Sequence, residues 1–76
     1  MPKITPTHWT LLEKIFLLDG WQFHRQEGSH RSYVKAGVAR PIVIPTYRSV
    51  PVSIIRNNMR TASMSRERYF ELLSQV

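Results

Sequence analysis

The sequence predicts an α+β fold, in which helices cover one face of a three-stranded antiparallel sheet. Apolar residues recur at helical spacing up to Leu18, alternate with polar residues from Trp21 onward, and return to helical spacing after Pro51. Hydrophobic residues make up 42% of the 76 residues, which is enough for a core and argues against disorder. We therefore expect residues 1–76 to form a single domain with a thin core.

The first helix is expected to begin at Thr5, which can act as the N-cap before Pro6. Asp19 and Gly20 supply a stop signal after the last apolar position. The stripe between these limits is wide and has helical spacing, and it consists of Trp9, Leu11, Leu12, Ile15, Phe16 and Leu18.

Three strands are expected next. The first starts at Trp21, where the period changes to two, and the second covers residues 30–36. The third is expected around residues 42–44, between Pro41 and Pro45. Because proline cannot donate a ladder hydrogen bond, this third strand should be short or lie at an edge of the sheet.

Two helices are expected to complete the chain. Pro51 can open a helix that continues to about Ala62, and Ser65 can cap the start of the last helix. Four of the larger aromatic side chains are assigned to the core because their spacings fit buried positions: Trp9, Phe16, Trp21 and Phe23.

The register of the first hairpin decides where the candidate site residues lie. We expect a loop over residues 26–29, in which Gly28 takes a positive φ, and this loop places Arg25 opposite His30. A slip of one residue would exchange the two faces of the strand. The expected register is favoured because it gathers three apolar side chains on one face: Trp21, Phe23 and Val34.

Positive charge limits the classes of partner. The formal net charge is +6, and nine of the eleven Lys and Arg residues lie from Arg25 onward. Such an excess on a small domain is typical of proteins that bind nucleic acid, an anionic membrane surface or an acidic protein, although it can also be a merely solvated surface. No apolar run approaches the roughly 20 residues of a membrane helix, so we expect a soluble globular domain. Of the three classes of partner we favour nucleic acid and expect no membrane partner.

His30 is the candidate for chemistry. A neutral imidazole can accept a proton, and the neighbouring Arg25 can hold a phosphate. On RNA this pair would allow removal of the 2′-hydroxyl proton, attack on the adjacent phosphorus and formation of a cyclic phosphate. No metal and no cofactor are expected, because three separated histidines without cysteine form no recognisable ligand set. A lone histidine is, however, more often structural or simply exposed.

The run GWQFHRQEGSHRSY over residues 20–33 resembles HicA-type toxins, which are mRNA interferases. Its most specific part, RQEGSH, is similar to the family's R-Q-x-G-S-H, and the likeness extends over about residues 9–75. The resemblance implies a fold like the double-stranded RNA-binding domain, with order α-β-β-β-α, and a catalytic histidine at His30. It also implies a HicB-type antitoxin that covers the site, so that any contact with DNA would be indirect, through that antitoxin.

Two positions depart from the family pattern. Members often follow the third strand with a basic residue and a histidine, whereas this chain has Thr46 and Tyr47. Asn58 stands where the family usually buries an apolar residue, so the helix around it is expected to pack less deeply or to shift. The residues expected to contact RNA are Arg25, Ser29, Arg31, Lys35, Tyr47 and Arg48, with Arg40 on the same backbone-tracking surface.

The leading hypothesis is a metal-independent endoribonuclease that cleaves single-stranded mRNA in the cytoplasm. A cytoplasmic location is expected because the N-terminus lacks the features of a secretory signal and the chain contains no cysteine. A noncatalytic RNA-binding module stays open as an alternative. So does an adaptor or DNA-associated protein that acts through its partner.

Overall fold

The structure is a computed structural model, and it describes residues 2–76. Strand β2 lies between β1 and β3 and is antiparallel to both. The predicted α+β class and the three-stranded antiparallel sheet are therefore confirmed. The elements follow one another in the order α1 (Trp9–Leu18), β1 (Gln22–Glu27), β2 (His30–Val34), β3 (Ile42–Pro45), α2 (Val52–Thr61) and α3 (Arg66–Leu73).

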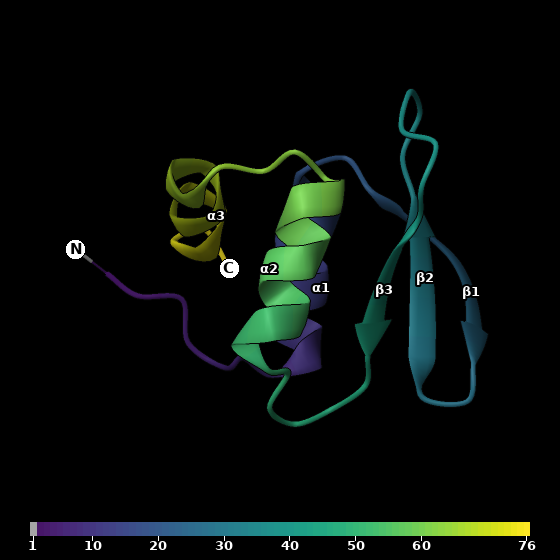
Figure 1. The fold of residues 1–76 in the computed structure, drawn as a ribbon, viewed down its shortest axis with the longest axis horizontal. Coiled ribbons are helices and arrows are strands. Elements are labelled where there is room, and N and C mark those ends of the chain that lie inside the picture. Colours follow the sequence, from purple (N-terminus) through teal and green to yellow (C-terminus); the bar gives the residue numbers. More distant parts are fainter. Residues whose placement is uncertain (1) are drawn as a thin grey trace.

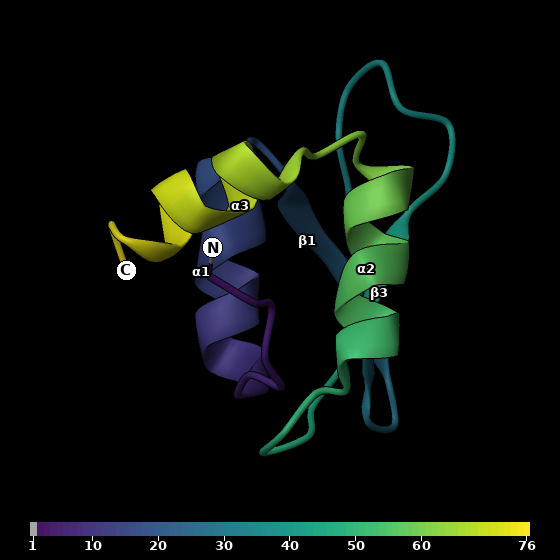
Figure 2. The same ribbon diagram turned by 60° about the vertical axis from the view of Figure 1, so that its left-hand side comes forward.

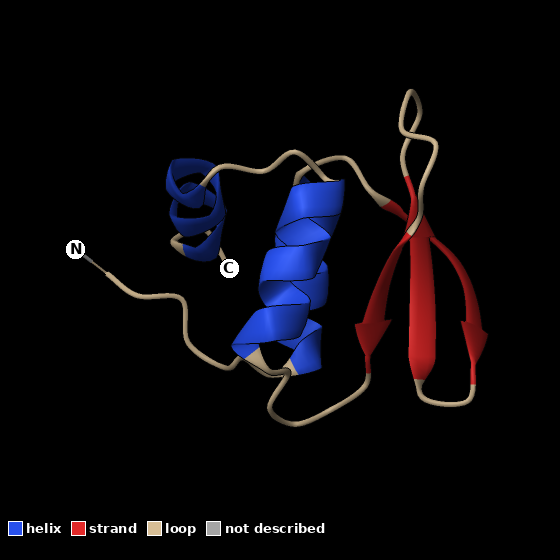
Figure 3. Ribbon diagram, in the orientation of Figure 1, coloured by secondary structure: helices blue, strands red, loops and turns tan. Residues whose placement is uncertain are grey.

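The helices gather on the β3 side of the sheet, and β1 forms the far edge (Figures 1 and 3). Both α1 and α2 pack against β3. Helix α3 lies across the C-terminal part of α1 (Figure 2), where Arg68 forms an ion pair with Asp19 at 3.2 Å. The third strand has four residues and lies at an edge, as its flanking prolines predict.

The core forms where the sheet meets the helices. Two of the four aromatic residues assigned to it, Phe16 and Trp21, are fully buried. Trp9 is half-buried and packs against the core, whereas Phe23 is 47% exposed, so its assignment to the core is wrong. The largest fully buried side chains are Trp21, Tyr33, Tyr69, Phe16, Leu12, Ile15, Ile42, Ile44, Ile55 and Val50.

Helix α1 begins later than the sequence predicts. Its N-cap is His8, whose Nδ1 accepts a hydrogen bond from the Thr10 amide at 3.2 Å, and not Thr5. The segment before the helix forms a β-bridge instead, in which Thr7 and Val50 exchange backbone hydrogen bonds of 3.2 and 2.8 Å. This bridge holds residues before the helix in an extended conformation. The long-range pairing therefore prevails over the local capping signal.

The other helix limits agree with the sequence. Helix α2 starts directly after Pro51 and ends at Thr61, close to the expected end at Ala62. The Ser65 hydroxyl caps α3 by accepting a hydrogen bond from the Arg68 amide at 3.0 Å.

The predicted register of the first hairpin is wrong. The turn contains two residues, Gly28 and Ser29, so that Glu27 and not Arg25 lies opposite His30. Gly28 has a φ of 56°, which confirms its expected positive value and suits the first position of a tight hairpin turn. Because residues two apart in a strand share a face, Arg25 and His30 still lie on the same face, as diagonal neighbours.

A β-bulge explains why the expected apolar cluster does not form. The pairing shifts between Phe23 and Arg25, which leaves His24 as the extra residue. Beyond the bulge, Phe23 lies opposite Tyr33, and their rings meet edge to face at 5.9 Å. Val34 lies opposite Gln22 instead of Trp21, and it is exposed. The bulge thus changes the face to which Phe23 belongs.

Candidate functional site

His30 is the first residue of β2 and is exposed at the end of the hairpin. The turn before it is tied to the loop that follows β3. The Ser29 carbonyl accepts hydrogen bonds from the Thr46 amide at 2.7 Å and from the Thr46 hydroxyl at 3.2 Å. The next residue, Tyr47, accepts a hydrogen bond from the Trp9 amide at 3.1 Å through its carbonyl. These contacts hold the Tyr47 loop between the hairpin and α1.

His30 lines an open cleft of about 360 Å³ between the sheet and α2. Tyr47 lines the same cleft and is 44% exposed. The walls of the cleft combine an aromatic ring, an imidazole, one guanidinium and two carboxamides with apolar side chains. The lining residues are His30, Arg40, Pro41, Val43, Pro45, Tyr47, Ile54, Asn57, Asn58 and Thr61.

Asn58 is the buried polar group of this cleft. The residue is 4% exposed, and within the described residues its Nδ2 atom has no hydrogen-bond partner. Helix α2 nevertheless buries this position together with Ile55 and Met59, so the helix packs closely at the place where the sequence suggested a looser contact. The sequence shows that Asn58 is unusual, but it does not show that the residue lines a cleft with His30.

Arg25 and Glu27 share the sheet face of His30. Their side chains form an exposed ion pair at 2.9 Å, and Glu27 lies directly opposite His30 across the hairpin. The sequence interpretation missed Glu27 as a site neighbour because the expected four-residue loop included it. A carboxylate at this position can accept a hydrogen bond from an imidazole N–H and orient the ring.

Arg31 lies on the opposite face of β2, where neighbouring side chains engage its partly buried guanidinium. Its side chain forms an ion pair with Glu13 at 3.0 Å and donates a hydrogen bond to the Tyr33 hydroxyl at 3.0 Å. Its guanidinium also lies 4.1 Å from the centre of the Phe23 ring and 5.3 Å from that of Trp9. The structure therefore separates Arg31 from the His30 face.

This network also changes the chemistry of its members. The hydrogen bond to Tyr33 is the main cause that raises the pKa of Arg31. Burial is the main cause that raises the pKa of Tyr33 to about 12, and the hydrogen bond that its hydroxyl donates to Glu13 adds to the effect. Glu13, Arg31 and Tyr33 together hold α1 against β2.

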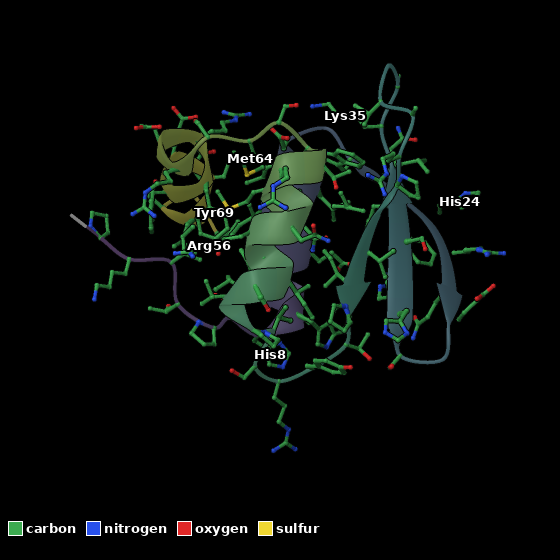
Figure 4. All side chains as sticks on the ribbon, viewed as in Figure 1. His8, His24, Lys35, Arg56, Met64 and Tyr69 are labelled. Carbon is green, nitrogen blue, oxygen red and sulfur yellow. The ribbon has the colours of Figure 1, made fainter. Side chains whose placement is uncertain are left out.

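The remaining expected contacts lie in two places. Lys35 is at the other end of the sheet from the hairpin turn (Figure 4), where its Nζ is 3.6 Å from the Asp19 carboxylate. Arg48 is exposed on the loop that carries Tyr47. The structure thus brings Arg25, Ser29, His30 and Tyr47 to one end of the sheet, with Arg48 on the adjoining loop.

The three histidines lie apart. His24 is in the bulge at the outer edge of the sheet, and His8 is at the start of α1 (Figure 4). The His8 ring is hydrogen-bonded to the Thr10 hydroxyl at 2.8 Å. In the part of the chain that the structure describes, no three His, Asp or Glu side chains lie close enough together to hold a metal ion.

The fold and the site define a small α+β protein of order α-β-β-β-α-α, with an exposed histidine beside the turn of its first hairpin. A sequence model described as the HicA toxin of bacterial toxin–antitoxin systems matches residues 9–64, which is more than half of the chain. The chain belongs to this HicA toxin family. Membership implies a cognate antitoxin partner.

A search of curated proteins found no match. Across residues 2–76, none of the helices has the length and apolar character needed to cross a membrane.

Proposed function

We propose that this toxin is an endoribonuclease that cleaves single-stranded mRNA, with His30 as the general base. The observation that carries the proposal is the position of His30. The imidazole is exposed at a cleft that also contains Tyr47, and it shares a sheet face with Arg25. The site therefore combines a proton acceptor, an aromatic surface for a base and a cation for a phosphate.

In the proposed reaction, neutral His30 removes the proton from a 2′-hydroxyl of the RNA. The 2′-oxygen then attacks the adjacent phosphorus, and the bond from phosphorus to the 5′-oxygen breaks. A proton from water or from the imidazolium completes the leaving 5′-hydroxyl, and the other product ends in a 2′,3′-cyclic phosphate. Arg25 stabilises the negative charge on the phosphoryl oxygens, and no step requires a metal ion.

The side chains around the cleft provide the other proposed contacts with RNA. The exposed ring of Tyr47 offers a surface on which a base can stack. Ser29 at the turn and Arg48 on the next loop are placed to contact the RNA backbone. Glu27 orients the His30 ring after Arg25 has turned toward the phosphate.

The antitoxin is proposed to be of the HicB type and to inhibit the toxin by covering the cleft at His30. In this account the toxin acts in the cytoplasm as a single domain, and any contact with DNA is indirect, through the antitoxin. The support for a covering partner is that the candidate base is exposed. A protein surface placed over the hairpin would exclude RNA.

The products of cleavage test this proposal. The purified protein should cut a defined single-stranded RNA to give fragments with 2′,3′-cyclic phosphate and 5′-hydroxyl ends, which mass spectrometry distinguishes. The matched control is His24→Ala, because His24 is exposed in the same hairpin but lies in the bulge. This control should cut like the parent protein. Fragments with 3′-hydroxyl and 5′-phosphate ends would contradict attack by the 2′-oxygen.

A noncatalytic RNA-binding module is the second candidate. It is favoured by one observation: among the described residues that line the cleft, His30 is the one imidazole and no side chain is a carboxylate, so the cleft supplies no second acid–base group. A protein that binds RNA with the same affinity with and without His30, and cuts it in neither form, would be of this second kind.

A further inference from the structure

Within residues 2–76, ion pairs engage four cationic side chains of the sheet region and α3, but they engage none on α2. Four of the five carboxylates take part in ion pairs, and their cationic partners are Arg25, Arg31, Lys35 and Arg68. In contrast, Arg40, Arg56 and Arg60 have no carboxylate within ion-pair distance among residues 2–76. All three are exposed. Of the seven cationic side chains that have no carboxylate partner among residues 2–76, these three lie on α2 and the loop before β3, and the other four are Lys3, Lys14, Arg48 and Arg66.

These arginines line hollows that continue from the His30 cleft. A second cleft, of about 390 Å³, shares Arg40, Asn57 and Thr61 with the cleft that contains His30. It also contains Arg60, which in turn lines a third cleft, of about 400 Å³, together with Arg56. Each hollow thus shares at least one side chain with the next. None of the described residues that line these three clefts is acidic.

The geometry of a helix explains the continuity. Successive residues of an α-helix are rotated by about 100°, so residues three or four apart lie side by side. Asn57 and Asn58 therefore belong to neighbouring strips of α2, and Arg60 lies next to Asn57 on the side away from Asn58. Arg56 follows beyond Arg60, and its side chain projects on the side of α2 that faces away from the sheet (Figure 4).

We infer that single-stranded RNA bound at His30 continues across the exposed side of α2, where Arg60 and Arg56 hold its phosphates. This inference rests on the proposed function and extends it, because it gives the RNA a second binding surface away from the cleavage site. We name this surface, formed by Arg40, Asn57, Arg60 and Arg56, the α2 track. In this inference the RNA backbone follows the α2 track and does not run along Arg31 and Lys35, which form ion pairs with Glu13 and Asp19.

The chemistry of the α2 track favours a phosphate backbone as its occupant. Guanidinium groups bind phosphate oxygens through paired N–H donors, and these arginines have no competing carboxylate. The Asn57 side chain adds an exposed amide between the cleft and the arginines. The lining residues of the three hollows pass around α2 from Asn58 to Arg56, and a flexible single strand can follow such a path better than a straight duplex can.

The test measures RNA binding as a function of salt. The probe is a fluorescent single-stranded RNA, and all proteins carry His30→Ala so that the probe stays intact. Arg56→Gln and Arg60→Gln are compared with Lys14→Gln, which removes an exposed charge from α1. Each lost phosphate contact should reduce the magnitude of the slope of log K against log salt by about 0.7. The variant that carries both Arg56→Gln and Arg60→Gln should therefore have a slope smaller in magnitude by about 1.4 than that of the parent. The control should keep the parent slope.

The outcomes separate this inference from the proposed function. Unchanged slopes in the arginine variants, or an equal change in the control, would overturn the α2 track even if the parent toxin cuts RNA. Equal binding of duplex DNA with the same dependence on the two arginines would also overturn the assignment to a single RNA strand. The expected slopes in a protein whose parent does not cleave would support the track and contradict only the proposed chemistry.

Discussion

Replacing Arg31 by alanine should destabilise the protein much more than replacing Arg25 by alanine. The sequence predicts that both residues contact RNA, but the structure gives them different surroundings. The Arg31 side chain is 21% exposed and is engaged by Glu13, Tyr33 and two aromatic rings. The Arg25 side chain is 64% exposed and is engaged by Glu27, which is 70% exposed.

The expected loss for Arg31→Ala follows from these contacts. Hydrogen bonds to charged groups contribute about 1.5–3 kcal/mol each when buried, and exposed cation–π contacts contribute about 0.5–1 kcal/mol each. Partial exposure reduces the ionic part, and Glu13 keeps the hydrogen bond from Tyr33. We therefore expect a loss of about 2–3 kcal/mol, which corresponds to about 10–20 °C in Tm for a domain of this size. Arg25→Ala should cost at most about 1 kcal/mol.

Thermal and urea unfolding followed by circular dichroism would measure both effects, with RNA affinity measured on the same samples. Arg31→Ala should lose stability while the folded fraction keeps its RNA affinity. Arg25→Ala should keep its stability and bind RNA more weakly. A Tm for Arg31→Ala within about 3 °C of the parent protein, together with weaker RNA binding, would refute the structural role given to Arg31.

Two further predictions concern buried polar groups. Because the pKa of Tyr33 is raised to about 12 from about 10, its stabilising effect is complete below about pH 10 and is lost as the pH rises through 12. The free energy of unfolding should therefore fall by about 2–3 kcal/mol over this range, and Tyr33→Phe should remove that part of the fall. A parallel fall in Tyr33→Phe would contradict the assignment. Asn58→Leu should stabilise the fold by about 1 kcal/mol, because it removes a buried amide whose Nδ2 has no partner. A lower urea midpoint would show that the amide is satisfied in solution.

The sequence predicts the elements well because their signals are local. The change of period at Trp21 marks the first strand, and Pro51 and Ser65 mark the starts of two helices. The first helix is the exception. Its start depends on the bridge between Thr7 and Val50, and no local pattern connects residues that lie so far apart in the chain.

The register was harder to predict, since a bulge and a short turn both alter it. The turn over Gly28 and Ser29 changes which residue faces His30, and the bulge at His24 moves Phe23 to the other face. The shared face of Arg25 and His30 was nevertheless predicted correctly. A shift of the pairing by two residues preserves the face, even though it changes the partner.

The sequence predicts the histidine of the candidate site, but it does not predict which residues line the cleft around it. His30 follows from the Gly-Ser-His stretch, which lies in one short segment of sequence. Asn57 and Asn58 reach the same cleft only because α2 packs against β3. The contact between Arg31 and Glu13 likewise joins two residues that are 18 positions apart in the chain. Such tertiary pairings carry no periodic signal.

The measurement that tests the central claim most directly is cleavage of a long unstructured RNA by the purified protein in excess EDTA, beside His30→Ala. Because His30 is exposed and belongs to no core cluster, the variant should keep the circular dichroism spectrum and Tm of the parent. The account predicts that the parent cuts RNA under these conditions and that the variant does not. Equal cleavage by the two folded proteins would remove His30 from the mechanism.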